Sequence, residues 1–193
     1  MKDLSEAKQE LVKSLVKNKK FHQLEFEVNS LLLEKRSPFL LNLLGVSKIS
    51  KVPTSKKDLN ESLDLFKEAY LKDRTLIDAL FNYAEISIRL LKYDEAKDLL
   101  IEYLSKKKYD YKATLALARI HFYLGNMDDC LLNYKKIIDN NEANSKLWAA
   151  FLFTTNYTYK YNQKDYLNFC NKYSEKLEKF DEKILKKFQY DKN

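Results

Sequence analysis

Side chains that could perform chemistry are few in this sequence of 193 residues. Its two histidines, His22 and His121, have no second His or Cys at metal-ligand spacing. Its two cysteines, Cys130 and Cys170, have no histidine placed to form a nucleophile–base pair. Carboxylates are plentiful, but they alternate with lysines along the whole chain, which is typical of solvated helix faces. We therefore expect no catalytic residue, no metal site and no enzymatic activity.

Composition excludes several other classes of protein. Two glycines, Gly45 and Gly125, lie 80 residues apart, so a glycine-rich phosphate loop cannot form and no nucleotide cofactor is expected. Only 2 Gly and 2 Pro also argue against turn-dense β folds. The sequence contains no run of 18 apolar residues and its first 20 residues lack an apolar signal core, so we expect no membrane segment and a cytoplasmic location.

The net charge of +7 raises the question of a nucleic-acid partner. Lysine supplies nearly all of it, because only four of the 35 basic residues are arginine. Arginine is the usual residue for bidentate contacts to phosphates and bases, and the lysines are interleaved with acidic residues. A protein or peptide partner is therefore favoured over nucleic acid.

The elements that position these side chains repeat along the chain. A large apolar residue recurs in successive segments 34 residues apart, and a small residue follows it directly in the first two of these segments. The spacing holds without a gap between Leu80 and Trp148. Each half of the repeat reads as an amphipathic helix with apolar residues at i, i+3, i+4 and i+7. The equivalent residues are Leu80, Tyr83 and Ala84; then Thr114, Leu117 and Ala118; then Trp148, Phe151 and Leu152.

This pattern resembles the tetratricopeptide repeat (TPR). The resemblance implies an all-α fold, a right-handed solenoid of antiparallel helix pairs that ends in a capping helix. Proline is missing from the position near the end of each repeat, where Arg74, Lys108 and Glu142 stand. The predicted organisation has a degenerate helix pair at 1–36, TPR-like repeats at 37–160 and a capping helix at 161–193. Within 37–160, the repeats are 37–75, 76–110, 111–144 and a half repeat from 145.

Helices are expected where the apolar pattern runs without interruption, with breaks at the Pro, Gly and Asn-rich positions. Small residues should mark the close approach of paired helices. The expected helices are 3–18, 21–34, 37–50, 57–72, 76–91, 94–106, 110–124, 127–139, 144–160 and 163–189.

In this family the first helix of each pair lines a concave groove that binds extended peptides. The aromatic residues there could stack on apolar side chains and the basic residues could pair with carboxylates, or some of the aromatics could be core between repeats. The acidic positions precede the basic ones, so the groove is expected to change from acidic to basic. The candidate groove residues are Asn42, Asp78, Phe81, Asn82, Glu85, Lys112, Leu115, Arg119, Phe122, Lys146 and Phe153.

Two groove chemistries of known relatives fit poorly. The carboxylate clamp of chaperone-tail binders finds matches in Asn82 and Lys112, but Val46 and Ala116 replace other members. The asparagine ladder of the O-GlcNAc transferases, which holds peptide backbone, is matched by Asn82 alone, since Leu43, Ala116 and Ala150 stand at the other positions.

After Trp148 the sequence leaves the repeat pattern. Phe151–Tyr157 and Asp165–Phe180 resemble the segment that joins repeats to the catalytic region in bacterial O-GlcNAc transferase-like (SPINDLY-type) proteins. Two functions therefore stay open: a non-catalytic scaffold that binds a peptide or protein in its groove, and the substrate-recruiting repeat region of such a glycosyltransferase. The sequence predicts neither the identity of the partner nor the oligomeric state.

Overall fold

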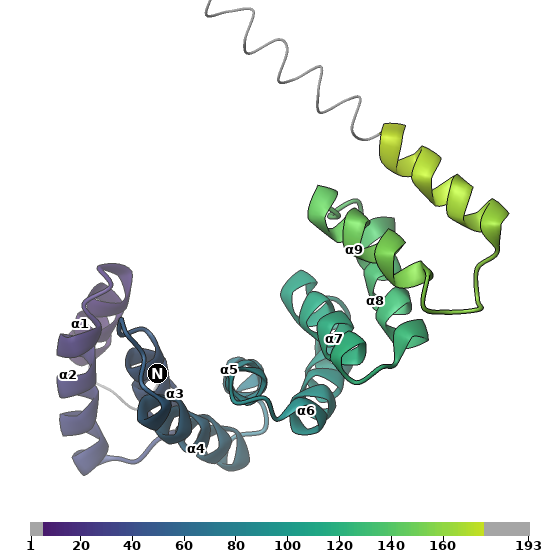
Figure 1. Ribbon diagram of the computed structural model, residues 1–193. Helices are drawn as coiled ribbons and strands as arrows, with labels where there is room; N and C mark the ends of the chain where they lie inside the picture. The colour runs from purple at the N-terminus through teal and green to yellow at the C-terminus, as the bar shows by residue number, and fades with distance from the viewer. Residues whose placement is uncertain (1–5, 176–193) are drawn as a thin grey trace, which may run out of the picture. The chain divides into compact units, whose positions relative to one another are not determined.

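Antiparallel helix pairs follow one another along the chain in the computed structural model, which describes residues 6–175 (Figure 1). All regular secondary structure in this range is helical. The chain divides into two compact units at Lys108 and Tyr109, called here the first and second unit. No helix in the described range is long and apolar enough to cross a membrane.

The first unit contains three helix pairs. Each helix packs against the next one in the chain, so the middle pair has a neighbouring pair on both sides. The helices are α1 (Glu6–Lys17), α2 (Phe21–Glu34), α3 (Pro38–Ile49), α4 (Lys56–Lys72), α5 (Ile77–Arg89) and α6 (Tyr93–Lys106).

Close approach of α3 and α4 requires a glycine. A Cβ placed on Gly45 would lie 2.5 Å from Cε1 of Phe66, whose ring is fully buried. At the corresponding place in the following pairs, Ala84 and Ala118 are also fully buried. Small residues at this repeat position thus let the paired helices approach closely, as the sequence predicts.

Side-chain ties link successive pairs of the first unit, and one of them recurs with the repeat. The guanidinium of Arg36, between α2 and α3, donates to both carboxylate oxygens of Glu68 on α4, at 2.7 and 2.6 Å. The Tyr70 hydroxyl donates to the Glu102 carboxylate and accepts a hydrogen bond from Lys106 Nζ at 2.6 Å. The interaction that recurs is made by the last residues of α4 and α6: Lys72 Nζ donates to the Arg36 carbonyl at 3.4 Å, and Lys106 Nζ donates to the Arg74 carbonyl at 3.0 Å.

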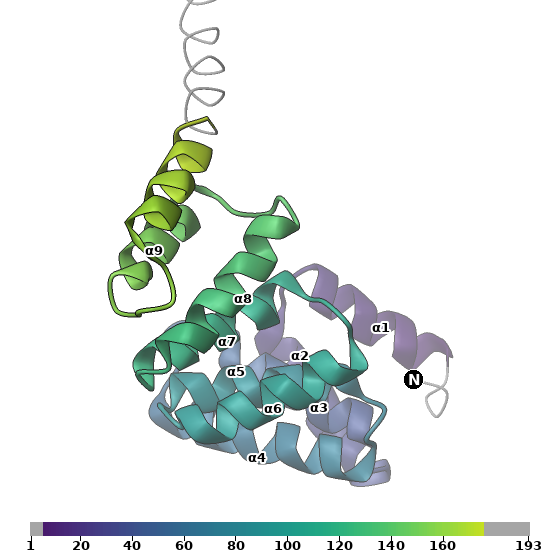
Figure 2. The ribbon, with the colours of Figure 1, turned by 90° about the vertical axis from the view of Figure 1, so that its right-hand side faces the viewer.

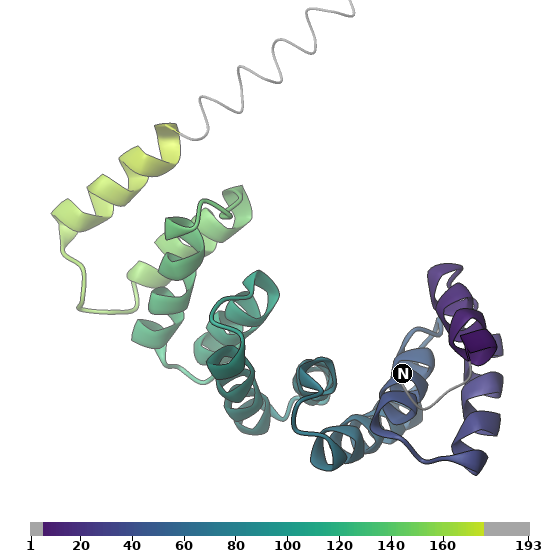
Figure 3. The same cartoon turned by 180° about the vertical axis from the view of Figure 1, so that it is seen from behind.

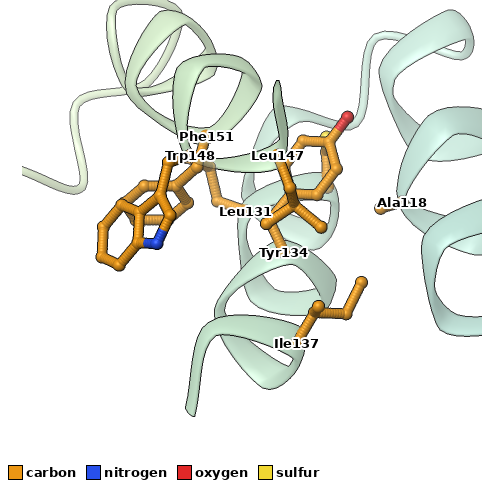
Figure 4. Close-up of a cluster of buried hydrophobic side chains, with 8 residues drawn as sticks. Ala118, Leu131, Tyr134, Ile137, Leu147, Trp148 and Phe151 are labelled. Atoms are coloured by element: carbon orange, nitrogen blue, oxygen red, sulfur yellow. The ribbon is translucent and has the colours of Figure 1, made fainter. Parts of the chain in front are cut away.

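The second unit begins with α7 (Tyr111–Tyr123) and α8 (Met127–Asp139), followed by α9 (Ser145–Thr155). Residues 163–175 are also helical and lie beside α9 (Figures 2 and 3). Figure 4 shows the core that α7, α8 and α9 share. Its buried side chains are Ala118, Cys130, Leu131, Tyr134, Ile137, Leu147, Trp148 and Phe151.

Residues 163–175 cover the far side of this core with aromatic rings. Phe169 contacts Phe151 edge to face, with ring centroids 4.9 Å apart, and Tyr173 stacks on Trp148 at 6.0 Å. This covering matches the capping role expected of the C-terminal helix for the part of it that is described. The remainder of the expected helix, to residue 189, lies outside the described residues.

The helix expected over 144–160 ends earlier, at Thr155. Its last turn offers side-chain donors to its own carbonyls: Thr154 Oγ1 bonds the Ala150 carbonyl at 2.7 Å, and Thr155 Oγ1 bonds that of Leu152 at 2.6 Å. Asn156 Nδ2 then donates to the Phe153 carbonyl at 3.1 Å. Local side-chain bonds of this kind compete with helix continuation, and the apolar pattern alone does not report them.

Four turns between helices use the same backbone arrangement. A residue with positive φ closes each of them: Lys19 at 54°, Leu91 at 61°, Gly125 at 78° and Asn141 at 57°. In every case this residue's N–H bonds the carbonyl three residues back, and the next N–H bonds the carbonyl five residues back. This is the Schellman arrangement, which satisfies carbonyls at a helix end and favours glycine at the positive-φ position.

Candidate functional site

The candidate groove residues are distributed over both units, so each group is described within its own unit. Five lie in the first unit, on α3 and α5: Asn42, Asp78, Phe81, Asn82 and Glu85. Six lie in the second unit, on α7 and α9: Lys112, Leu115, Arg119, Phe122, Lys146 and Phe153.

In the first unit, three of the five candidates make contacts inside the unit. Asn82 Nδ2 donates to Asn42 Oδ1 at 2.9 Å, and Asn42 is only 8% exposed. The ring of Phe81 packs against that of Tyr103 on α6, with centroids 5.1 Å apart. Asp78 and Glu85 are exposed. The two asparagines therefore tie α3 to α5, and this face offers solvent mainly carboxylates.

In the second unit, three of the six candidates surround one pocket. Arg119 and Phe122 of α7 and Phe153 of α9 line a hollow of about 200 Å³. The rings of Phe122 and Phe153 have centroids 6.5 Å apart, and Phe153 also contacts Tyr157 at 5.1 Å. Phe153 is 53% exposed. We call this hollow the aromatic pocket; its full lining is Arg119, Phe122, Tyr123, Tyr134, Ala150, Phe153 and Thr154.

Buried polar groups lie beneath the aromatic pocket. Burial raises the pKa of the Tyr134 hydroxyl to about 12, an effect that the positive charge of Arg119 partly offsets. Burial likewise raises the pKa of the Cys130 thiol to about 11, although hydrogen bonds with Tyr134 and Thr154 oppose the shift. Both groups stay protonated at neutral pH. Tyr134 therefore keeps an O–H donor near Arg119, and Cys130 is a packed thiol with little thiolate character.

The three other candidates of the second unit differ in role. Leu115 is half-buried and packs against the core of the unit. Lys112 and Lys146 are exposed, each near the start of its helix. No ion pair joins Lys112, Arg119 or Lys146 to any other residue in the range 6–175. Within this part of the chain, no carboxylate neutralises any of the three cations.

Sequence reasoning missed part of the pocket wall. Tyr134 of α8 lines the pocket, but it is not among the candidate groove residues, which were taken from the first helix of each pair. Tyr123 and Thr154, in the last turns of α7 and α9, also line the pocket and are not among the candidate groove residues. The sequence does offer a signal for this wall, because aromatic residues gather near the ends of α7 and α9, at Phe122, Tyr123, Phe153 and Tyr157.

The fold has clear counterparts among solved structures. A crystal structure of MamA protein superposes with a TM-score of 0.74 at 15% identity, covering 93% of this chain and 94% of that one. The MamA RS-1 ArsTM double mutant gives a TM-score of 0.74 at 13% identity over 93% and 98% of the two chains. MamA 41-end from Desulfovibrio magneticus RS-1 gives 0.72 at 13% identity over 90% and 94%.

No protein-family model matches the sequence, and no curated protein is similar to it at a significant level. The likeness to MamA, a helical repeat protein of TPR type, is therefore a likeness of fold. This chain has a TPR-type helical repeat fold. The fold class predicted from the 34-residue spacing is confirmed.

Proposed function

We propose that this protein is a non-catalytic scaffold that binds a protein or peptide partner on the face formed by α7 and α9. The observation that carries the proposal is the aromatic pocket, where Phe122 and Phe153 remain accessible beside Arg119. Aromatic residues and arginine are the side chains that most often dominate the energy of protein interfaces. Repeat folds of this type commonly use such surfaces for protein interaction.

The chemistry of the remaining residues agrees with a binding role. Within the described range, no group of three His, Cys, Asp or Glu side chains could hold a metal ion. Both cysteines are free thiols, which fits a reducing compartment, and we place the binding in the cytoplasm on that basis.

The glycosyltransferase-linked alternative stays a sequence prediction. It depends on the resemblance of residues 151–180, of which only those up to 175 are described. The single match to the asparagine ladder, Asn82, uses one amide hydrogen to bond Asn42. No feature of the first unit favours this alternative over a scaffold.

Site-specific photocrosslinking tests the proposed face. We would replace Phe153 with p-benzoylphenylalanine in the full chain, expose cell extract to light, and identify adducts by mass spectrometry. Leu132 provides the matched control, because it is an exposed apolar residue of α8 in the same unit, 45% accessible. We expect adducts to one or a few proteins from position 153 and not from position 132.

The captured protein must then bind the purified chain directly, as measured by calorimetry. Equal adducts from both positions, no adducts from position 153, or adducts only to nucleic acid would contradict the proposal.

A further inference from the structure

We infer that the aromatic pocket accepts one large apolar side chain of a partner segment that also carries acidic side chains next to it. This inference rests on the proposed function and specifies the chemistry of the partner. Its two halves, an apolar anchor and a flanking acid, depend on different residues of α7 and α9. The two halves can therefore be tested separately.

The apolar half follows from the walls and size of the pocket. Four of its seven lining residues are aromatic, namely Phe122, Tyr123, Tyr134 and Phe153, and Ala150 is the smallest of the seven. Tyr123 is 63% exposed, so the wall is accessible from solvent. A volume of about 200 Å³ is smaller than a typical small-molecule site. It suits one aromatic or large aliphatic side chain, since an apolar cavity of roughly 150 Å³ holds benzene.

The acidic half follows from the charges on the two helices. Neither α7 nor α9 contains Asp or Glu, whereas both carry exposed cations. Arg119 lines the pocket itself and has no carboxylate partner within residues 6–175. A guanidinium beside aromatic walls is well suited to a two-point contact with a carboxylate. The chain thus presents a positive charge at the pocket edge that nothing in the described range neutralises.

Two further cations set the direction of the acidic flank. Lys112 precedes Arg119 by seven residues on α7, and Lys146 precedes Phe153 by seven residues on α9. Seven residues of helix correspond to about 10 Å. Both lysines are therefore displaced from the pocket toward the starts of α7 and α9. An extended segment anchored in the pocket would place its acidic residues toward these lysines.

A peptide fits this surface better than a nucleic acid does. Tyr157, which contacts Phe153, also lines a second hollow, whose charged residues are Asp128, Asp129 and Lys160. A continuous phosphate backbone that left the pocket in that direction would meet these carboxylates. A peptide with acidic residues only on its other side avoids them.

Selection from a random peptide display library on the full chain tests the inference. We expect enriched peptides to share an aromatic or large aliphatic residue with Asp or Glu within two or three positions. For a synthesised enriched peptide, Arg119→Glu should raise Kd at least about tenfold, and Phe153→Ala should do the same. Replacing the peptide's acids with amides should weaken binding to the native chain but not to Arg119→Glu.

Matched controls separate the site from general effects. Arg89→Glu reverses another exposed arginine, on α5, and Leu132→Ala trims another exposed apolar residue of the second unit; both should leave Kd unchanged. Circular dichroism verifies that each variant keeps its helical content.

Three outcomes would overturn the inference: failure of any peptide to enrich, enriched peptides without acids, or peptides that bind Arg119→Glu as tightly as the native chain. Tighter binding of polyuridine than of any enriched peptide, lost in Arg119→Glu, would assign the pocket to RNA instead. Crosslinking from position 153 distinguishes the two levels. Specific adducts to a protein together with peptides insensitive to Arg119→Glu would leave the scaffold function standing and remove only this description of its partner.

Discussion

Helix α5 of the first unit and helices α7 and α9 of the second carry the same repeat pattern but use it differently. On α5, Phe81 is packed against Tyr103 and Asn82 is bonded to Asn42. On α7 and α9, Arg119, Phe122 and Phe153 surround an accessible pocket. The repeat register decides which face of a helix a residue occupies. It does not decide whether that face is closed by a neighbour.

The difference can be traced to individual residues of the second helices. Tyr103 of α6 supplies the ring that covers Phe81, and the residue 34 positions later is Ile137, which is fully buried in the core of the second unit. The position 34 residues after Phe81 is Leu115, a smaller side chain that packs into the same core. The accessible rings of the second unit stand at other positions, near the ends of α7 and α9.

The largest expected effect comes from a cavity in the core of the second unit. Phe151→Ala deletes a fully buried ring that contacts Phe169, and we expect a loss of about 3–5 kcal/mol in unfolding free energy. Urea denaturation measures this loss. Hydrogen exchange should become faster in α8 and α9, with α3 and α4 as the internal reference. Uniform acceleration in both units would contradict the separate cores described here.

A smaller effect is expected where α3 meets α4. Gly45→Ala places a methyl group 2.5 Å from the Phe66 ring, and overpacking of this kind costs about 1–3 kcal/mol. Alanine would otherwise stabilise the helix by about 1 kcal/mol relative to glycine. The measurement is the urea midpoint of the single variant and of Gly45→Ala combined with Phe66→Leu. Recovery in the double variant is expected; a stabilised single variant would show that the ring moves aside freely.

Paired truncations examine the contrast between the closed and the open face directly. Phe81→Ala should cost roughly 1–2 kcal/mol, because a half-buried ring loses its aromatic partner. Phe153→Ala should cost less than about 1 kcal/mol, since half of that side chain is already in water. Thermal unfolding of the two variants provides the comparison. Equal losses would mean that the rings around the pocket are structural.

The smallest expected effect is a loss of unfolding free energy at acidic pH. Hydrogen bonds from Arg36 lower the pKa of Glu68 from 4.5 to about 2. A carboxyl whose pKa is lowered on folding contributes stability above its ordinary pKa and loses it as the pH falls from about 4.5 toward 2. The pair is partly solvent-exposed, so its contribution is about 1 kcal/mol or less. Arg36→Met should flatten this acid dependence, as followed by the NMR titration of Glu68 and by urea unfolding between pH 2 and 6.

Sequence alone was sufficient for the elements but only partly for the site. Nine helices of the described range lie where the apolar period predicts them, because burial of one helix face dominates the pattern. The early end of α9 was missed, since it depends on hydroxyl and amide bonds to local carbonyls. The groove predicted from the repeat includes Arg119, Phe122 and Phe153, which line one pocket, but its binding role stays a prediction. The repeat pattern could not reveal that Tyr103 covers Phe81.

Positions 91 and 125 close equivalent turns in successive repeats, one with leucine and the other with glycine. A left-handed backbone costs a residue such as leucine about 1–2 kcal/mol, and glycine avoids this cost. Glycine at position 91 would therefore stabilise the α5–α6 turn. Leu91 is exposed and does not line the aromatic pocket. Such a reserve favours evolvability: a single change at Leu91 could offset a destabilising change in the pocket, leaving the binding face free to diversify.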